Sequence, residues 1–343
     1  MWIGALLSST AATFGRLLIV GILPNSILVA YVWLLLTVHA FTNRGKPLTF
    51  YDLVPDNFKS DAGGLILGAL LVLVLTMMVQ PFQIRLVRLL EGYWQANRIG
   101  VVPHRVASAF HERRRERLLD KTGSAEDPLS DTTLCEMHAR EQCREQRQAR
   151  RRSAAADRAV SKLRLYPPPG EDVLPTMLGN ALRRNESIAG ERYGLKTIHT
   201  WPRLYPYLSD NLAKEYRAQI DSIDASTNLA LVFTLMSGVG VVAFANDQWL
   251  LIVPALLLLL AVGAYRAAIA AVSGHGVALA AAYDLHRFDM LRALHLELPS
   301  TPELEAVRNQ KLSDFFYDTD EEVNPGSAED LLEGFTYVHD FEE

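Results

Sequence analysis

The 343-residue chain has only two cysteines, Cys135 and Cys143, and both lie in a highly charged segment. This usage argues against a disulfide framework. The N-terminus has no basic region before its first apolar residues and no convincing small-residue cleavage site, so we expect no cleaved signal peptide.

The signatures of common enzymes are also missing. The chain has no phosphate loop of the Gly-x4-Gly-Lys-Ser/Thr type, no Gly-x-Ser-x-Gly elbow and no His-Glu-x-x-His motif. Cys135, His138 and Cys143 have a superficial metal-ligand spacing, but no fourth ligand is evident. We therefore predict no metal, no cofactor and no assignable catalytic residue.

Long apolar runs are what the chain does contain. Four blocks are long enough to cross a bilayer, which needs about 20 apolar residues. They cover residues 17–41, 63–80, 228–245 and 249–272. The sequence thus predicts an all-α membrane protein with four transmembrane helices and helical cytoplasmic extensions. Pro24 interrupts the first block, which leaves a second interpretation in which residues 1–22 form a separate interfacial helix.

None of the four blocks carries Asp, Glu, Lys or Arg near its middle. Ionisable groups inside a membrane mark proton relays and ion pathways, so a proton-coupled transporter is disfavoured. Small residues recur at four-residue spacing in the third and fourth blocks, and we predict that these two blocks pack as a tight hairpin through them. The residues are Ala230, Thr234 and Gly238 in the third block, and Gly263, Ala267 and Ala271 in the fourth.

Basic residues set the predicted orientation. Arginines follow the second and fourth blocks, whereas the loop 42–62 is balanced in charge and the connection 246–248 is very short. We expect a multi-pass protein of the cell membrane with both termini in the cytoplasm.

Charge is segregated along the chain. Residues 82–226 hold 25 Lys/Arg against 19 Asp/Glu, a net of +6, whereas residues 299–343 hold 2 against 13, a net of −11. Helices are predicted over 103–123 and about 132–166. The second of these helices is too polar to bury a complete face, so it is a solvated arm, a partner helix in an oligomer or a basic strip against anionic lipid. Specific nucleic-acid binding is not expected, because no aromatic residue is interleaved between residues 110 and 166.

Composition divides the chain into five segments. One helix is predicted to run without a break from 210 to 245, whereas "SGHG" (273–276) is expected to interrupt the continuation of the fourth span as a flexible hinge. The acidic tail is expected to be largely disordered and to dock on the basic arm. The segments are a transmembrane pair (1–81), the basic arm with a Pro-rich spacer (82–170), a compact cytoplasmic module (171–226), a transmembrane hairpin with a cytoplasmic helix (227–298) and the tail (299–343).

The stretch "WPRLYP" (201–206) raises a choice between a ligand site and a structural elbow. Pro202 and Pro206 disfavour helical conformation in the residues before them. We expect an elbow whose rings pack on protein. The alternative is an acid–base cluster of Glu91, Glu186, His199 and Arg203 at the membrane surface.

Four stretches resemble an uncharacterised family of bacterial four-span membrane proteins. They are "EGYW" (91–94), "LPTMLGNALRRNE" (174–186), "YGLKTIHTWPRLYP" (193–206) and "AYDLHRFDMLRALHLELP" (282–299). The resemblance covers most of the chain outside the arm and tail, and it implies no activity. The candidate functional surface that follows from these stretches is Glu91, Tyr93, Trp94, Glu186, His199, Trp201, Arg203 and Tyr205.

The function predicted from these features is a membrane scaffold or signalling component that presents a cytoplasmic partner-binding module. The expected partners are membrane lipid and a second copy or another membrane protein. Two alternatives stay open: a membrane-bound enzyme acting on a lipid-linked or nucleotide substrate at the cytoplasmic face, and an effector that permeabilises the membrane.

Overall fold

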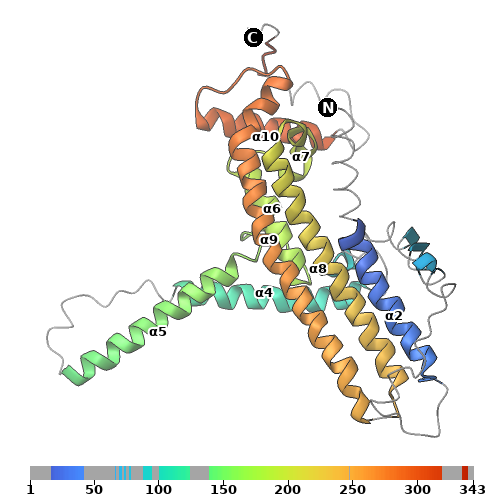
Figure 1. Cartoon of the computed structure of the whole chain (residues 1–343). Coiled ribbons are helices and arrows are strands. Elements are labelled where there is room, and N and C mark those ends of the chain that lie inside the picture. The colour runs from blue at the N-terminus through green and yellow to red at the C-terminus, as the bar shows by residue number, and fades with distance from the viewer. Residues whose placement is uncertain are drawn as a thin grey trace. The chain divides into compact units, whose positions relative to one another are not determined.

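The computed structural model describes residues 17–41, 88–94, 100–123, 139–246, 248–318 and 334–338, together with isolated helical positions between 66 and 78. The described residues are all-helical, apart from turns and one isolated antiparallel bridge between Leu296 and Tyr337. The α-helices (Figure 1) are α2 (Leu23–Thr37), α4 (Val101–Gly123), α5 (Ala139–Leu163), α6 (Met177–Glu191), α7 (Thr197–Leu204), α8 (Asp210–Ala243), α9 (Ile252–Ala293) and α10 (Pro302–Asp318). A π-helical turn, η1 (Leu17–Ile22), precedes α2, and the 3₁₀ turns η4 (Tyr205–Tyr207) and η5 (Gln248–Leu251) precede α8 and α9.

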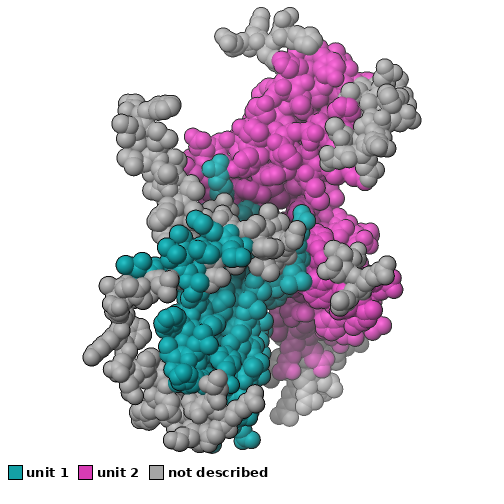
Figure 2. Space-filling view, turned by 90° about the vertical axis from the view of Figure 1, so that its right-hand side faces the viewer, with its two compact units in different colours: residues 1–90, 217–272 teal, residues 91–216, 273–343 magenta. Residues whose placement is uncertain are grey.

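The chain divides into two compact units (Figure 2). Unit 1 contains residues 1–90 and 217–272, and unit 2 contains residues 91–216 and 273–343. The helices α8 and α9 each contribute residues to both units.

Unit 1 contains the apolar segments. Three helices of the described chain are long and apolar enough to cross a membrane: Val20–Thr37, α8, and Gln248–Ala293, which is η5 with α9. They coincide with the first, third and fourth predicted blocks and support a membrane protein. Most of the second block lies outside the described residues, so the fourth span stays a prediction.

The proline in the first span is compensated by a side chain from α8. Pro24 has no N–H, so an α-helical hydrogen bond from residue 24 to the carbonyl of Val20, four residues earlier, cannot form. The side-chain amide of the buried Asn228 donates to that carbonyl at 2.8 Å. An unpaired carbonyl in lipid costs several kcal/mol, so this bond explains both a proline and an asparagine in apolar surroundings.

Replacing Asn228 by Ala is expected to lower the free energy of unfolding by about 1–2 kcal/mol, because the Val20 carbonyl loses the side-chain amide that donates to it. Pro24→Ala restores an N–H at position 24 and is expected to recover most of that loss in the double variant. Thermal unfolding of the purified protein in detergent measures both effects. Equal losses from Asn228→Ala in the two backgrounds would contradict this explanation.

The hairpin of the third and fourth blocks does not pack through the small-residue faces that were predicted. A Cβ added at Gly238 or Gly263 would meet no atom within 4 Å, and Thr234 and Ala267 are exposed. The face of α8 in contact is instead that of Gly240, which lies about 200° around the helix from Gly238.

Around Gly240 three apolar helices approach closely. An added Cβ there would lie 2.5 Å from the Tyr31 hydroxyl of α2 and 3.3 Å from Pro254 of α9. The hydroxyl of Ser237 donates to the Pro254 carbonyl at 2.8 Å. Close packing and interhelical hydrogen bonds are the interactions that hold helices together in lipid. The apolar helices therefore pack through a small residue, as predicted, but the residue is Gly240 and not the predicted ones.

The long helices differ in how well the sequence predicted them. The unbroken helix expected from residue 210 is confirmed as α8. The break expected at 273–276 is wrong, because α9 continues through it as one helix of 42 residues. Gly276 does not break the helix but allows α6 to approach it, because a Cβ at this position would lie 2.4 Å from the side-chain oxygen of Asn185 on α6.

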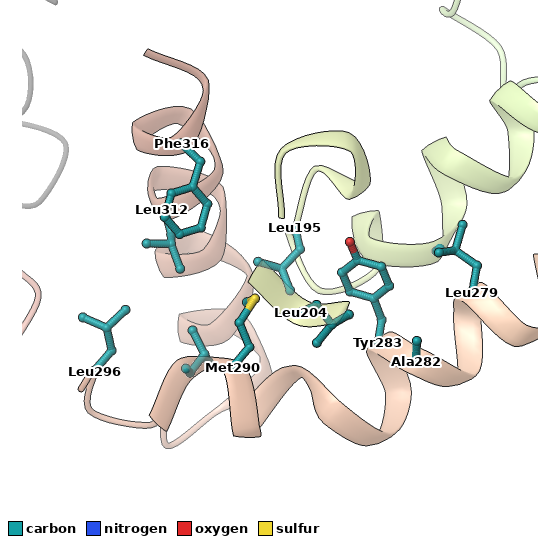
Figure 3. Packing of buried hydrophobic residues seen from close by; sticks show 11 residues of the cluster. Leu195, Leu204, Leu279, Ala282, Tyr283, Met290, Leu296, Leu312 and Phe316 are labelled. Carbon is teal, nitrogen blue, oxygen red and sulfur yellow. The ribbon is translucent and has the colours of Figure 1, made fainter. Parts of the chain in front are cut away.

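The main core of unit 2 joins α6, α7, α9 and α10 (Figure 3). Leu195 and Leu204 have no exposed surface, and in this view Leu312 and Phe316 of α10 lie on one side of Leu195 and Tyr283 of α9 on the other. The phenol of Tyr283 is hydrogen-bonded to the Thr200 hydroxyl at 2.8 Å and donates to the Thr197 carbonyl at 3.1 Å. This buried polar contact fixes α7 on α9.

The basic arm forms the predicted helices α4 and α5. The two helices run antiparallel, since Leu118 packs with Ala159 while His111, earlier on α4, is hydrogen-bonded at 2.9 Å to Tyr166, which follows α5. Tyr166 and Pro167 are buried, so the first residue of the predicted Pro-rich spacer packs on protein, whereas Pro169 and Gly170 are exposed. Cys135, His138 and the side chain of Cys143 lie outside what the structure describes.

Part of the acidic tail is ordered, which corrects the predicted disorder of 299–343. Residues 302–318 form α10, with Leu312 and Phe316 buried. The acidic Glu305 is also buried and pairs with Arg287 at 2.7 Å. Residues 319–333 and 339–343, and with them the predicted docking of the tail on the arm, lie outside the described residues.

Candidate functional site

Two of the sequence stretches, "EGYW" and "LPTMLGN", meet in unit 2. The Thr176 hydroxyl donates to the Glu91 carbonyl at 2.7 Å and also caps α6 by accepting from the Gly179 N–H at 3.1 Å. A Cβ on Gly179 would lie 1.9 Å from the Glu91 carbonyl oxygen. Gly92 has a φ of +97°, and a Cβ on it would meet Pro175 at 2.5 Å. Both glycines therefore allow the turn at residue 92 to sit directly on the start of α6.

Asn180 holds the entry to α6 and was missed by the sequence reasoning. Its side-chain oxygen accepts from the Leu174 N–H at 2.7 Å, and its amide donates to the carbonyls of Leu174 at 2.8 Å and Thr176 at 2.7 Å. Asn180 is fully buried. Its only sequence signal was a polar residue among apolar ones at the start of a helix.

Glu186 on α6 is the most perturbed acid of the site. Burial raises its pKa, and with the nearby carboxylates of Glu91 and Glu171, against the opposing effect of Arg183, the pKa reaches about 7. Glu171 itself accepts from the Ser187 hydroxyl at 2.5 Å and lies 3.7 Å from Arg183. Glu91 and Glu186, both predicted from the sequence, thus form an electrostatically coupled pair that holds a proton near neutral pH.

An aromatic cluster surrounds Trp201. Its ring lies 4.6 Å from Tyr216, 5.6 Å from Tyr205 and 6.3 Å from Tyr283, measured between centroids. Tyr216 in turn lies 5.1 Å from the ring of the buried His275. The predicted elbow therefore holds for Trp201 and Tyr205, which are half-buried on protein, but Tyr207 is exposed.

The conformation predicted for "WPRLYP" is wrong. Trp201 and Pro202 are both inside α7, and Tyr205 starts a 3₁₀ turn. The carbonyl that loses a donor to Pro202 belongs to Ile198, which is exposed, so solvent can satisfy it. The restriction on residues before proline is overridden here by burial of Thr200 and Leu204 on the core.

His199 and Arg203 do not join Glu91 and Glu186. The His199 ring meets Tyr317 of α10 edge to face at 5.0 Å, and the Arg203 guanidinium lies 3.9 Å above the ring of Phe316. These contacts join α7 to α10. The four-residue acid–base cluster considered from the sequence is therefore split into a carboxylate pair at α6 and a helix contact at α10.

Tyr93 borders a cavity of about 600 Å³ next to α4. The hydroxyl oxygen of Ser108 is buried there with no hydrogen-bond partner among the described residues. Trp94 precedes residues 95–99, which are not described. The cavity is lined by groups of both charges, including Arg105, Glu112, Asp172 and Arg183 beside Tyr93 and Ser108.

Within the described ranges, no group of three His, Cys, Asp or Glu side chains is arranged to hold a metal ion. Comparison of the chain with protein-family models, with curated proteins and with solved structures gives no match.

Proposed function

We propose that the chain is a multi-pass membrane scaffold or signalling component that presents unit 2 to a protein partner in the cytoplasm. The spanning helices of unit 1 support the membrane assignment. The orientation and the cell membrane as location rest on the distribution of basic residues. The partner is a second copy of the chain or another membrane protein.

The observation that carries the proposal is the outer surface of α7 and α10. Ile198 on α7 is 66% exposed, and Val307 and Tyr317 on α10 are 59% and 49% exposed. The same two helices have a well-formed core on their inner side. Exposed apolar side chains on helices that pack together are typical of protein–protein contact sites.

The contacts between these helices prepare the surface for binding. Lys196 pairs with Asp314 at 2.7 Å, and the Ser313 hydroxyl accepts from the Lys196 N–H at 3.0 Å. Together with the His199 and Arg203 contacts they hold α7 and α10 in one arrangement. A surface that is rigid before binding loses less conformational entropy on association.

Site-specific photo-cross-linking in membranes tests the proposal. A photoreactive residue at position 198 or 307 is expected to give one adduct of discrete mass, whereas position 160, an exposed apolar site on α5, serves as the matched control. Ile198→Glu should abolish the adduct formed from position 307 without changing the midpoint of thermal unfolding. An adduct equally strong at position 160, or none at 198 and 307, would overturn the proposal; the mass of the adduct distinguishes a second copy from another protein.

The enzyme alternative keeps one specific observation in its favour, the coupled carboxylates Glu91 and Glu186. A carboxyl group with a pKa of about 7 is suited to general acid–base catalysis. If the alternative holds, Glu186→Gln abolishes turnover of a lipid-linked or nucleotide substrate while the adduct from position 307 persists. That pattern separates the two functions.

A further inference from the structure

We propose that one face of α4 binds the surface of an anionic lipid bilayer. The face is defined by Val102, Val106 and Phe110, which are 68%, 67% and 59% exposed. They are spaced four residues apart, so they cover an arc of about 80° on one side of the helix. The site is separate from the α7 and α10 surface proposed for a protein partner.

The rest of α4 explains why this face is unusual. The helix is strongly charged, with six Lys/Arg against three Asp/Glu, a net of +3. Three exposed apolar side chains on one side of such a helix are therefore unusual. Arg113 and Arg117, both exposed, continue the same arc toward the C-terminus of the helix. The face is therefore apolar in its first half and basic in its second.

The opposite side of α4 is already occupied by protein. His111 contacts Tyr166, Arg115 donates to the Glu171 carbonyl at 3.2 Å, and Leu118 is buried against α5. These contacts fix the rotation of α4 about its axis. The face with Val106 at its centre is consequently directed away from the α5 contact.

An occupant of this face has to supply hydrocarbon for the valines and phenylalanine and negative charge for the arginines. The interface of an anionic bilayer supplies both, because acyl chains and phosphates lie next to each other there. The second predicted span ends at residue 80, and α4 begins at residue 101, so the 20 residues between them reach about 70 Å at most when extended. The bilayer surface is thus within reach of α4.

Spin labels on the full-length protein in nanodiscs test the contact. In a background with Cys135→Ser and Cys143→Ser, the label is attached through Val106→Cys or, independently, Phe110→Cys. Ser153→Cys, exposed on α5, is the matched control. The measured quantity is the ratio of collision rates with oxygen, which concentrates in lipid, and with a water-soluble nickel chelate.

With phosphatidylglycerol in the discs, the ratio at positions 106 and 110 is expected to be several-fold higher than at 153. The double variant Arg113→Gln/Arg117→Gln is expected to lower it toward the value at 153. Equal ratios at 106, 110 and 153 would overturn the proposal. Exclusion of both oxygen and nickel from position 106 would overturn it in favour of a protein that covers α4. A high ratio that is identical in discs of phosphatidylcholine alone would overturn the part assigned to the arginines.

Discussion

Glu186→Gln is expected to stabilise the protein at pH 8 and to remove much of the pH dependence of its unfolding. Burial and the neighbouring Glu91 raise the pKa of Glu186 from 4.5 to about 7 in the folded chain. The folded state therefore binds this proton more tightly than the unfolded state. Its contribution to stability is complete below about pH 4.5 and is lost as the pH rises through about 7.

The size of the effect follows from the shift of the pKa. Two and a half pH units correspond to about 3 kcal/mol, which is an upper limit for the gain of the neutral Gln at pH 8. Thermal unfolding of wild type and variant between pH 5 and 8 measures it. Wild type should lose stability over this range, and the variant should lose much less.

The matched control for Glu186 is Glu116→Gln, which neutralises an exposed carboxylate on α4. We expect its pH profile to follow that of wild type. Glu91→Gln offers a second check, because removal of the neighbouring charge lowers the pKa of Glu186 and shrinks the pH dependence without touching Glu186 itself. Parallel profiles for wild type and Glu186→Gln would rule out this carboxyl as the source.

Gly179→Ala is expected to destabilise the chain by about 3 kcal/mol, although alanine is the better helix former. The added methyl group would lie 1.9 Å from the Glu91 carbonyl oxygen and 3.0 Å from Leu174. Because the nearest atom is backbone, the turn that contains Gly92 has to move away from α6. The hydrogen bond from Thr176 to the Glu91 carbonyl would be lost with it.

Gly263→Ala is the matched control for Gly179→Ala, since it makes the same change within a helix where nothing lies within 4 Å. It is expected to be neutral or to stabilise by about 0.5–1 kcal/mol. Thermal unfolding, with proteolysis at the 91–94 turn as a local readout, measures both variants. A Gly179→Ala protein as stable as wild type would show that the junction is not tightly packed.

How far the sequence predicts this fold depends on whether local pattern or distant packing decides each element. The helix α8 was predictable because nothing between 210 and 243 interrupts a helix. The helix α9 was not, because the glycines of "SGHG" look like a break until Asn185 of α6 is seen against Gly276. The same holds for Pro202, which a short helix tolerates when its other residues are buried on a core.

The helix α10 shows why hydrophobic periodicity misses some elements. Its buried positions include Glu305, Asn309, Leu312 and Phe316, at helical spacing, but two of the four are polar. Glu305 is buried because Arg287 pairs with it, and Asn309 because its amide donates to the Tyr193 carbonyl at 2.7 Å. Both partners are distant in the sequence, so an acidic composition suggested disorder where the structure has a helix.

The candidate site divides in the same way. The sequence analysis selected residues that do interact within unit 2: Glu91 with Glu186, and Trp201 with Tyr216. It did not indicate which of them meet. Only the placement of α7 against α10 separates His199 and Arg203 from the carboxylates.

The bond between Asn228 and Val20 also sets a timing for biogenesis. The two residues are 208 positions apart, so at about 5–20 residues per second the ribosome makes the donor some 10–40 s after the acceptor. A first span that enters the bilayer during synthesis has no Asn228 amide at its Val20 carbonyl until the third apolar segment follows. Until Asn228 is made, water or the insertion machinery has to supply the hydrogen bond that the Asn228 amide later gives to the Val20 carbonyl. A chain truncated before residue 228 never gains that amide.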